Sequence, residues 1–533
     1  MTALATAHDR LEHRRERPSG RALWLGAVAL ALAWSAVPVV LLAIHTIVHG
    51  GVLSGSDGPL AGADQLFYMD SIRQSGAHLL IADHFDLVIG HAVFLNPLYL
   101  LAGLVWRAGV PLQAAFWALK LLAAPALALG ALALAARGLS SATARASAVV
   151  LGLFYFSPVL PLLAWTGAIG STTRYQLLLP VGESMPAWQL WGYPHAALAI
   201  GLEAGALLGA VALADRRRTL ERPGPVLAAT CAAACLVGWL HPWQGATLIL
   251  VLAALAIYGR ARQVTLLLLA PALAAAAPLV YEAILPHVDT AWHVDSVRNA
   301  VGQGPLWILL VALLPLAVPA AFGIRAVREG SLRVVLAAWP LAALVVYFGT
   351  SQFPYHALQG ISLPLAVLAV EGWQQLRASR AAVLGLLLVA AVTVPGAVYE
   401  VRTFRDSERS HAAPYWFTAG ERAALRYLEA TPTPGGVIAR QYLGAAVPAF
   451  TGRRTWVGEW TWTPEYGARV ALSELLMAGR LSPDRARQLV ASTGARFALT
   501  DCRAPAPLGR LLGPLVVSKR AFGCAAVYEL RPR

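Results

Sequence analysis

Long apolar runs dominate this chain and restrict what it can fold into. Stretches rich in Ala, Leu and Val, each about 17–25 residues long and so able to cross a bilayer, recur from Leu23 to Tyr399. Hydrophobic residues make up 58% of the 533 positions and charged residues only 13%, roughly half the charged share of a soluble domain. The runs do not alternate as barrel strands do. The sequence therefore predicts a multi-pass α-helical membrane protein.

About eleven spanning helices are predicted from these runs. The first run is too long for a cleaved signal peptide, so we expect a retained helix behind a basic cytoplasmic tail at 1–21. The runs together define a transmembrane domain over 22–400. The expected spans are 22–49, 111–136, 146–168, 193–214, 225–240, 243–258, 263–282, 303–324, 332–350, 355–374 and 380–399.

The arginines set the predicted orientation. Of the 42 basic residues 40 are arginines, and those of the membrane domain lie mainly in short connections. With a cytoplasmic N-terminus the inner connections are ARGLSSATAR, DRRRTLERPG, GRARQ, RAVREGSLR and QQLRASR. All of them carry arginine, as the positive-inside rule requires. This placement gives the formal charge of +14 a topological meaning and argues against nucleic acid as a partner.

Two regions need a particular interpretation to keep that orientation. A full crossing by 77–110, within a first outer loop at 50–110, would place every later arginine outside. We therefore expect helices that lie at the membrane surface there. The run 225–258 must hold two short passes that turn outside at His241, where Pro242 breaks the helix.

Titratable groups gather on the predicted outer side. The histidines from His45 to His411 fall at outer helix ends, in outer loops or beyond the last span. Longer outer loops explain part of this asymmetry. Polar groups at a membrane interface usually line a cavity, so we expect a functional site at the outer face. Five aspartates crowd the first outer loop: Asp57, Asp64, Asp70, Asp83 and Asp86.

The composition changes after Glu400. Residues 401–533 have no spanning run and alternate helix-like stretches with strand-like ones, of which the latter are GGVIARQY, RFALTD and AAVYELR. We predict a soluble extracytoplasmic α/β domain. In that compartment Cys502 and Cys524, beside neighbouring strand-like segments, could form a disulfide. The alternative is that they are two small buried residues.

The stretch GADQLFYMDSIRQSG lies in the first outer loop. Its Asp-amide pair, tyrosine, isoleucine and Ser-Gly, with a later Pro-Leu-Tyr helix, resemble the first periplasmic loop of the GT-C glycosyltransferases. The resemblance is to the branch of protein O-mannosyltransferases and aminoarabinose transferases. It departs at Gln65, where many members have glutamate, and at Asn96, where many have proline. The matching residues are Asp64, Gln65, Tyr68, Ile72, Ser75, Gly76, Asn96, Pro97, Leu98 and Tyr99.

The resemblance implies a catalytic aspartate in this loop, surface helices after it and a polyprenyl-phosphate sugar donor. The chemistry supports Asp64 independently, because sugar transfer to a hydroxyl needs a base and carboxylate is the usual one. Asp64 could instead cap the helix that begins at LFYMDSI, and the two roles are compatible. Asp70, six residues further on, would point in another direction on a helix, so the two aspartates are not expected to pair.

The predicted substrate-binding residues share the outer side with Asp64. Arg174 and Arg298 are candidates for the donor phosphate, because guanidinium groups suit phosphate oxygens. Each arginine could instead extend its side chain to the interface. The whole predicted set is Gln65, Tyr68, Arg174, His195, His241 and Arg298.

We expect no cofactor. The run Asp83-His84-Phe85-Asp86, with His78 and His91, could bind a divalent metal or form a solvated turn, and its spacing fits no recognised site. The stretch GRRTWVGEWTWTPEY at 452–466 could contact carbohydrate or form a packed aromatic layer at the membrane surface.

These features predict a glycosyltransferase in the cell (plasma) membrane, of the inverting kind. It would transfer a sugar from a polyprenyl-phosphate donor to a glycan, lipid or protein acceptor outside. A transporter or flippase of lipid-linked glycans is the alternative, although the polar groups gather at one face and not at the midplane. A catalytically silent scaffold of the same fold is another alternative.

Overall fold

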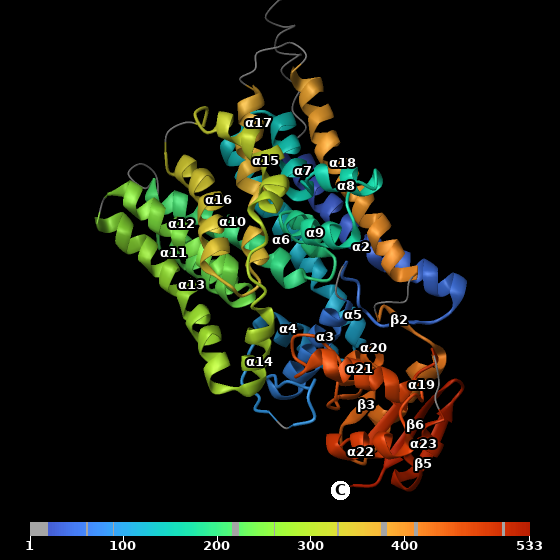
Figure 1. Cartoon of the computed structure of the whole chain (residues 1–533). Coiled ribbons are helices and arrows are strands. Elements are labelled where there is room, and N and C mark those ends of the chain that lie inside the picture. The colour runs from blue at the N-terminus through green and yellow to red at the C-terminus, as the bar shows by residue number, and fades with distance from the viewer. Residues whose placement is uncertain are drawn as a thin grey trace, which may run out of the picture.

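The computed structural model describes residues 20–59, 62–88, 90–215, 223–260, 262–327, 330–374, 381–409, 414–503 and 507–532. It consists of a bundle of helices and a smaller mixed domain that packs at one end of the bundle (Figure 1). We call residues 414–532 the tail domain, and the end of the bundle next to it the tail end.

The bundle consists of helices that are long and apolar enough to cross a membrane. The described residues hold nine, and the bent pair α7 (Ala142–Phe154) and α8 (Val159–Trp165) makes a tenth. The predicted multi-pass helical class is thereby confirmed. The nine are α2 (Gly20–His49), α5 with α6 (Leu112–Ala118 and Lys120–Gly138), α10 (Pro194–Ala214), α11 (Pro223–Leu240), α12 (Pro242–Gly259), α13 (Arg262–Val288), α15 (Leu306–Gly323), α16 (Ser331–Gly349) and α18 (Ala381–Arg409).

The predicted count of eleven spans is not confirmed. The remaining expected span, 355–374, consists of the short turn η2 (Pro354–Leu358) and α17 (Ser362–Gln374). With 13 residues and a rise of about 1.5 Å per residue, the described part of α17 is shorter than the hydrocarbon core of about 30 Å.

The described ends of α10 and α11 that flank one arginine-bearing connection lie at the end of the bundle opposite the tail domain. The start of α10, the end of α11 and the start of α12 all line one cavity at the tail end, so the α10–α11 connection must lie at the opposite end. Arg217 and most of its loop, the segment 375–380 and residues 1–19 lie outside the described residues. The side of the membrane that each end faces stays a prediction.

The first loop places two helices between the bundle and the tail domain (Figure 1). These are α3 (Gly62–His78) and α4 (Pro97–Arg107). Asn96 is the N-cap residue of α4, and its side chain accepts hydrogen bonds from the Leu98 and Tyr99 amides. The two helices touch through backbone, since a Cβ on Gly76 would lie 2.5 Å from the carbonyl oxygen of Gly103. Glycine at both positions thus permits the close packing that holds α3 in place.

The tail domain is built around a four-stranded sheet in the order β3-β4-β6-β5. Its strands β3 (Val437–Ala439), β4 (Phe497–Thr500) and β6 (Ala525–Leu530) are mainly buried and match the three predicted strand-like stretches. The edge strand β5 (Val516–Phe522) is mostly exposed, so it lacks an apolar pattern in the sequence. The predicted small α/β domain is confirmed, with helices α19 (Ala419–Ala430), α20 (Gln441–Thr451), α21 (Tyr466–Met477), α22 (Pro483–Thr493) and α23 (Leu508–Leu512).

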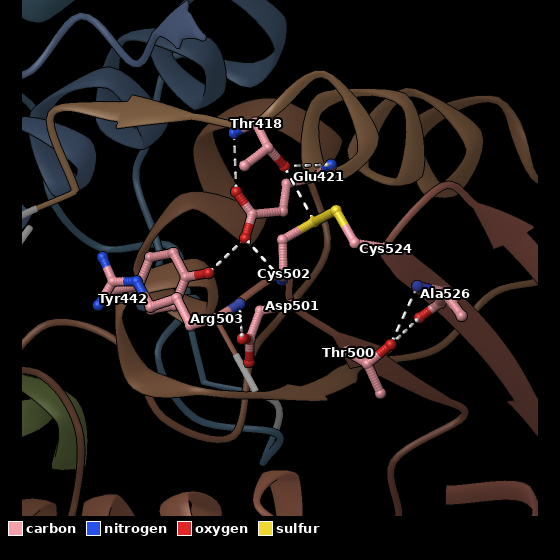
Figure 2. The surroundings of a disulfide bond; sticks show 9 residues. All are labelled: Thr418, Glu421, Tyr442, Thr500, Asp501, Cys502, Arg503, Cys524 and Ala526. Carbon is pink, nitrogen blue, oxygen red and sulfur yellow. Dashed lines mark hydrogen bonds between the residues drawn. A yellow bond between two sulfur atoms is a disulfide. The ribbon is translucent and has the colours of Figure 1, made fainter. Parts of the chain in front are cut away.

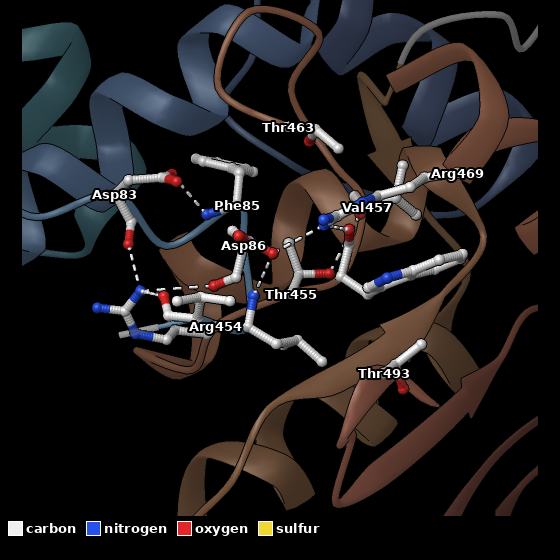
Figure 3. A network of polar contacts seen from close by, with 12 residues as sticks. Asp83, Phe85, Asp86, Arg454, Thr455, Val457, Thr463, Arg469 and Thr493 are labelled. Atoms are coloured by element: carbon white, nitrogen blue, oxygen red, sulfur yellow. Dashed lines mark hydrogen bonds and ion pairs between the residues drawn. The ribbon is translucent and has the colours of Figure 1, made fainter. Parts of the chain in front are cut away.

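Strand pairing and ion pairs are among the contacts that join the tail domain to the first loop. Strand β2 (Trp416–Phe417) pairs antiparallel with β1 (Val52–Leu53), which follows α2 directly. Arg469 binds Asp86 at 2.8 Å, and Arg454 donates to the carbonyl oxygen of Asp83 at 2.8 Å (Figure 3). These contacts fix the tail domain directly against the segment that follows α3.

A disulfide joins Cys502 to Cys524 in the structure (Figure 2). It connects the loop after β4 to the turn between β5 and β6. Beside it the Thr418 hydroxyl lies 3.1 Å from the Cys502 sulfur, and Glu421 accepts a hydrogen bond from the Cys502 amide at 3.0 Å. Thr418 and Glu421 also form the capping box that begins α19, so the disulfide lies on the part of the domain that leads back to β2.

Candidate active site

One cavity of about 330 Å³ opens where the tail end of the bundle, the first loop and the tail domain meet. Its size suits a small ligand group. Its wall combines aromatic rings, carboxylic acids and histidines. The polar and aromatic lining includes Asp64, Tyr68, Tyr99, Glu183, Trp188, Tyr193, His195, Trp239, His241, Trp243, Glu282, Trp292, Asp295, His356, Glu459, Trp460 and Trp462.

Asp64 lies in the first turn of α3 and lines this cavity. Its Oδ2 accepts a hydrogen bond from the Tyr193 hydroxyl at 3.2 Å, while its buried Oδ1 has no donor among the described residues. Burial raises the pKa of Asp64 well above its ordinary value, and the negative charge of Glu459 raises it further. The carboxyl group is therefore positioned to take a proton from a ligand.

Gln65, predicted to bind substrate, points away from the cavity wall. Its side chain is fully buried, and its Oε1 accepts hydrogen bonds from the Ser56 hydroxyl at 2.8 Å and the Gly58 amide at 3.1 Å. Gln65 thus holds the loop before α3 against the helix start. A neutral amide can accept these donors in a buried place without the cost of burying a charge, which is a structural reason for glutamine here.

The loop that precedes α3 is also held in place by a buried ion pair. Lys120 at the start of α6 bonds Asp57 and donates to the carbonyl oxygen of Ser35 in α2 at 3.0 Å. Both charged side chains are almost completely buried. The Tyr415 hydroxyl of the tail domain donates to the carbonyl oxygen of Gly58 at 2.7 Å. Two spanning helices and the tail domain therefore together position the turn that places Asp64.

Three histidines line the cavity, each carried by a different element. His195 is in the first turn of α10, His241 is in the α11–α12 turn, and His356 is in η2. The His241 ring centroid lies 6.2 Å from that of His195 and 5.1 Å from that of His356. The Nδ1 atoms of His195 and His241 are buried without a hydrogen-bond partner among the described residues. These two nitrogens therefore have unused hydrogen-bonding capacity beside the cavity.

His356 is held by a buried acid. Its Nδ1 lies 3.3 Å from Oε2 of Glu183, which also accepts from the amides of Gln359 at 2.5 Å and Gln189 at 3.0 Å. Glu183 thus stands at the centre of a network between two segments that are far apart in the sequence, 183–189 and 356–359.

A loop of the tail domain forms part of the cavity. Glu459, Trp460, Thr461 and Trp462, from the stretch that the sequence left open between carbohydrate contact and aromatic packing, all line it. Trp462 stacks on Phe67 of α3 with 4.8 Å between ring centroids. The tryptophans thus pack against α3 and also face the cavity, whereas contact with carbohydrate stays a prediction.

Neither of the two arginines predicted to bind phosphate is among the residues that line the cavity, and their role stays a prediction. Arg174 lies over the ring of Tyr399 at 5.4 Å, and Arg298 is in the last turn of α14 (Thr290–Asn299). Among the described residues that line the cavity there is neither arginine nor lysine. Of the predicted substrate-binding set, the structure brings Tyr68, His195 and His241 to the cavity beside Asp64.

The acidic run after α3 has structural partners. Asp83 accepts from the Phe85 amide at 2.7 Å, and Asp86 binds Arg469 (Figure 3). His84 lies 3.1 Å from Asp70 of α3. Across the described ranges, no group of three or more His, Cys, Asp or Glu residues is arranged to hold a metal ion.

Solved structures share this architecture. The chain is similar to the arabinofuranosyltransferase AftD from Mycobacteria, with 15% identity, a TM-score of 0.59 and coverage of 97% of this chain and 40% of AftD. It is also similar to the oligosaccharyltransferase AglB from Archaeoglobus fulgidus, in complex with an inhibitory peptide and a dolichol-phosphate (14%, TM-score 0.54, 90% and 69% covered). ArnT from Cupriavidus metallidurans bound to undecaprenyl phosphate matches at 13%, with a TM-score of 0.50 and 94% and 98% covered.

These neighbours are glycosyltransferases of the GT-C superfamily, and the fold of the chain is the GT-C fold. The likeness that the first loop indicated is thereby confirmed at the level of the fold. No family model matches the sequence, and no curated protein matches it.

Proposed function

We propose that the protein is a membrane glycosyltransferase that moves a sugar from a polyprenyl-phosphate carrier to an acceptor hydroxyl, with Asp64 as the general base. The observation that carries this proposal is the position of Asp64 in a cavity whose other walls are aromatic rings and histidines. Two of the structural neighbours were solved with a dolichol-phosphate or undecaprenyl phosphate bound, which supports the choice of donor.

Three parts of the reaction have candidate groups. Asp64 accepts the proton of the acceptor hydroxyl while the hydroxyl oxygen attacks the anomeric carbon. The bond from that carbon to the phosphate oxygen breaks on the opposite face, so the configuration inverts and the electron pair leaves with the polyprenyl phosphate. The imidazoles of His195 and His241 donate hydrogen bonds to the phosphate oxygens. The sequence analysis assigned this phosphate-binding role to Arg174 and Arg298.

The aromatic part of the wall suits a sugar. Rings of Trp188, Trp292 and Trp462 face the same space as Asp64, and each presents a flat apolar face beside polar groups. A sugar ring has this same combination of apolar faces and hydroxyl edges. The absence of arginine and lysine from the described lining favours neutral N–H donors as the phosphate ligands.

The test is incorporation of labelled sugar in proteoliposomes that contain the protein and synthetic polyprenyl-phosphate sugars. We expect transfer by the wild type, and a rate lower by about 10² to 10⁴ in Asp64→Asn, the typical effect of losing a general base. Asp70→Asn is the matched control. Asp70 lies on the same helix, but its carboxylate accepts a hydrogen bond from Gln74 and it is not among the residues that line the cavity. Movement of the lipid across the bilayer without transfer would identify a flippase instead.

A further inference from the structure

The carboxyl group of Glu459, which belongs to the tail domain, interacts with Asp64 in the cavity wall. Glu459 is only 3% exposed, and the two side chains are within hydrogen-bonding reach of each other in the cavity wall. Two carboxylates at such a distance in a buried place cannot both stay ionised at modest cost. The pair therefore holds one proton.

The donors around Glu459 decide where that proton resides. Its Oε2 accepts three hydrogen bonds, from the Thr461 amide at 2.8 Å, the Thr461 hydroxyl at 2.8 Å and the Trp462 amide at 3.0 Å. Hydrogen bonds to the charged form favour that form. Asp64 receives one hydrogen bond, from Tyr193. Burial raises the pKa of both carboxyl groups, but the hydrogen bonds to Glu459 lower its pKa again, whereas Asp64 has only the one from Tyr193. The proton of the pair therefore resides preferentially on Asp64.

The fold holds Glu459 at this place. Gln441 of α20 donates to the carbonyl oxygen of Gly458 at 2.7 Å, and the Gly458 amide donates to the Thr463 hydroxyl at 3.1 Å. A Cβ on Gly458 would lie 2.5 Å from the ring of Phe85, so the loop lies tightly against the segment after α3. Trp462 adds its stacking on Phe67, one turn beyond Asp64 on the same helix.

We propose that Glu459 is a positioning residue of the reaction that acts through Asp64 and finally receives the proton. The inference rests on the proposed function. Asp64 takes the proton of the acceptor hydroxyl, and the proton that Asp64 already carries passes along the hydrogen bond to the Glu459 carboxylate. One O–H bond breaks at the acceptor and one forms at Glu459, so charge and protons balance. The tail domain thereby supplies part of the proton pathway.

The other titratable groups of the cavity wall are phenols, three imidazoles and further acids. No described lysine or arginine lines the cavity to offset the charge of Glu459. Glu459 is therefore the charge whose removal changes the proton affinity of Asp64 most directly. The titratable groups that line the cavity from the remaining elements are Tyr68, Tyr99, Tyr175, Glu183, Tyr193, His195, His241, Glu282, Asp295 and His356.

Infrared pH titration of the purified protein in detergent tests the pair without needing a substrate. The protonated carboxyl band of Asp64, identified by its loss in Asp64→Asn, should titrate at a pH at least about one unit lower in Glu459→Gln. The variant Glu459→Asp, which keeps the charge, should restore most of the shift. Glu465→Gln is the matched control, since Glu465 belongs to the same stretch but is exposed. A band that Glu459→Gln leaves in place would overturn the inference.

The second arm of the test is the pH dependence of the rate of sugar transfer. The acid limb of kcat/KM for sugar transfer should move to lower pH in Glu459→Gln, with a lower plateau because Asp64 becomes a weaker base. A lower plateau with an unmoved limb would show that Glu459 only supports the loop. Absence of transfer by the wild type would contradict the proposed function, whereas the infrared result would still decide whether the pair shares a proton.

Discussion

Trp462 of the tail domain stacks on Phe67 of α3 with 4.8 Å between ring centroids and 16° between the ring planes. The same indole packs edge to face against Trp292 of α14 at 4.9 Å. Trp462 thus joins the tail domain, the first loop and the segment after α13 at the cavity wall.

Truncation of Trp462 should lower activity more than it lowers the amount of folded protein. Trp462→Ala removes the ring that holds the 458–463 loop on α3, so we expect kcat/KM to fall by at least about tenfold, equivalent to roughly 1.4 kcal/mol. Trp462→Phe keeps an aromatic face and should retain most activity. Transfer assays on protein that elutes as a single species in size-exclusion chromatography measure this. Equal activity of the alanine variant and the wild type would contradict it.

Asp295 should make stability depend on pH. Burial raises the pKa of this carboxyl group in the folded protein to about 7 from its ordinary 3.8, and Glu459 adds to the shift. The folded state then binds more protons than the unfolded state between these two values. The free energy of unfolding must therefore fall as the pH rises from about 4 to about 7.

The variant Asp295→Asn should lose this part of the pH dependence. Thermal unfolding in detergent at pH 5 and pH 8 is the measurement, and the difference in Tm between the two should shrink in the variant. The exposed Asp484, changed to Asn, serves as the control. Identical pH slopes for Asp295→Asn and the wild type would show that Asp295 ionises normally.

Reduction of the Cys502–Cys524 disulfide should destabilise the tail domain. The two cysteines are 22 residues apart, and closing a loop of that order stabilises a fold by about 3 kcal/mol. We expect a lower Tm of the tail domain in Cys502→Ser with Cys524→Ser than in the wild type. Cys231→Ser is a control, because Cys231 is a free cysteine in α11. An unchanged Tm would mean that the disulfide adds no stability.

The orientation predicts which engineered cysteines are accessible in intact cells. Ser492→Cys, on an exposed position of α22, should react with a membrane-impermeant reagent from outside. Arg217→Cys, in the DRRRTLERPG loop, should react only after the membrane is opened. Both variants are made in a background without Cys231 and Cys235. External labelling of Arg217→Cys would reverse the predicted topology.

The sequence alone determined the class of fold, because spanning helices depend on local properties. Twenty apolar residues in a row cannot stay in water and must satisfy their own backbone hydrogen bonds in lipid. The run 225–258, for example, is two helices that turn at His241. The strands β3, β4 and β6 were also predictable, since their apolar side chains form the buried core of the sheet.

Only the tertiary structure decided which side chains share the cavity. Asp64 and Glu459 are almost 400 positions apart, and the sequence around each says nothing about the other. Gln65 is adjacent to Asp64 in the chain but lies outside the cavity lining, because neighbouring residues on a helix point in different directions. Arg174 is likewise next to Tyr175, a lining residue, yet packs on Tyr399. Spanning segments follow from local hydrophobicity. A site assembled from several helices, the loops between them and a separate domain depends on contacts that form only when those parts pack together.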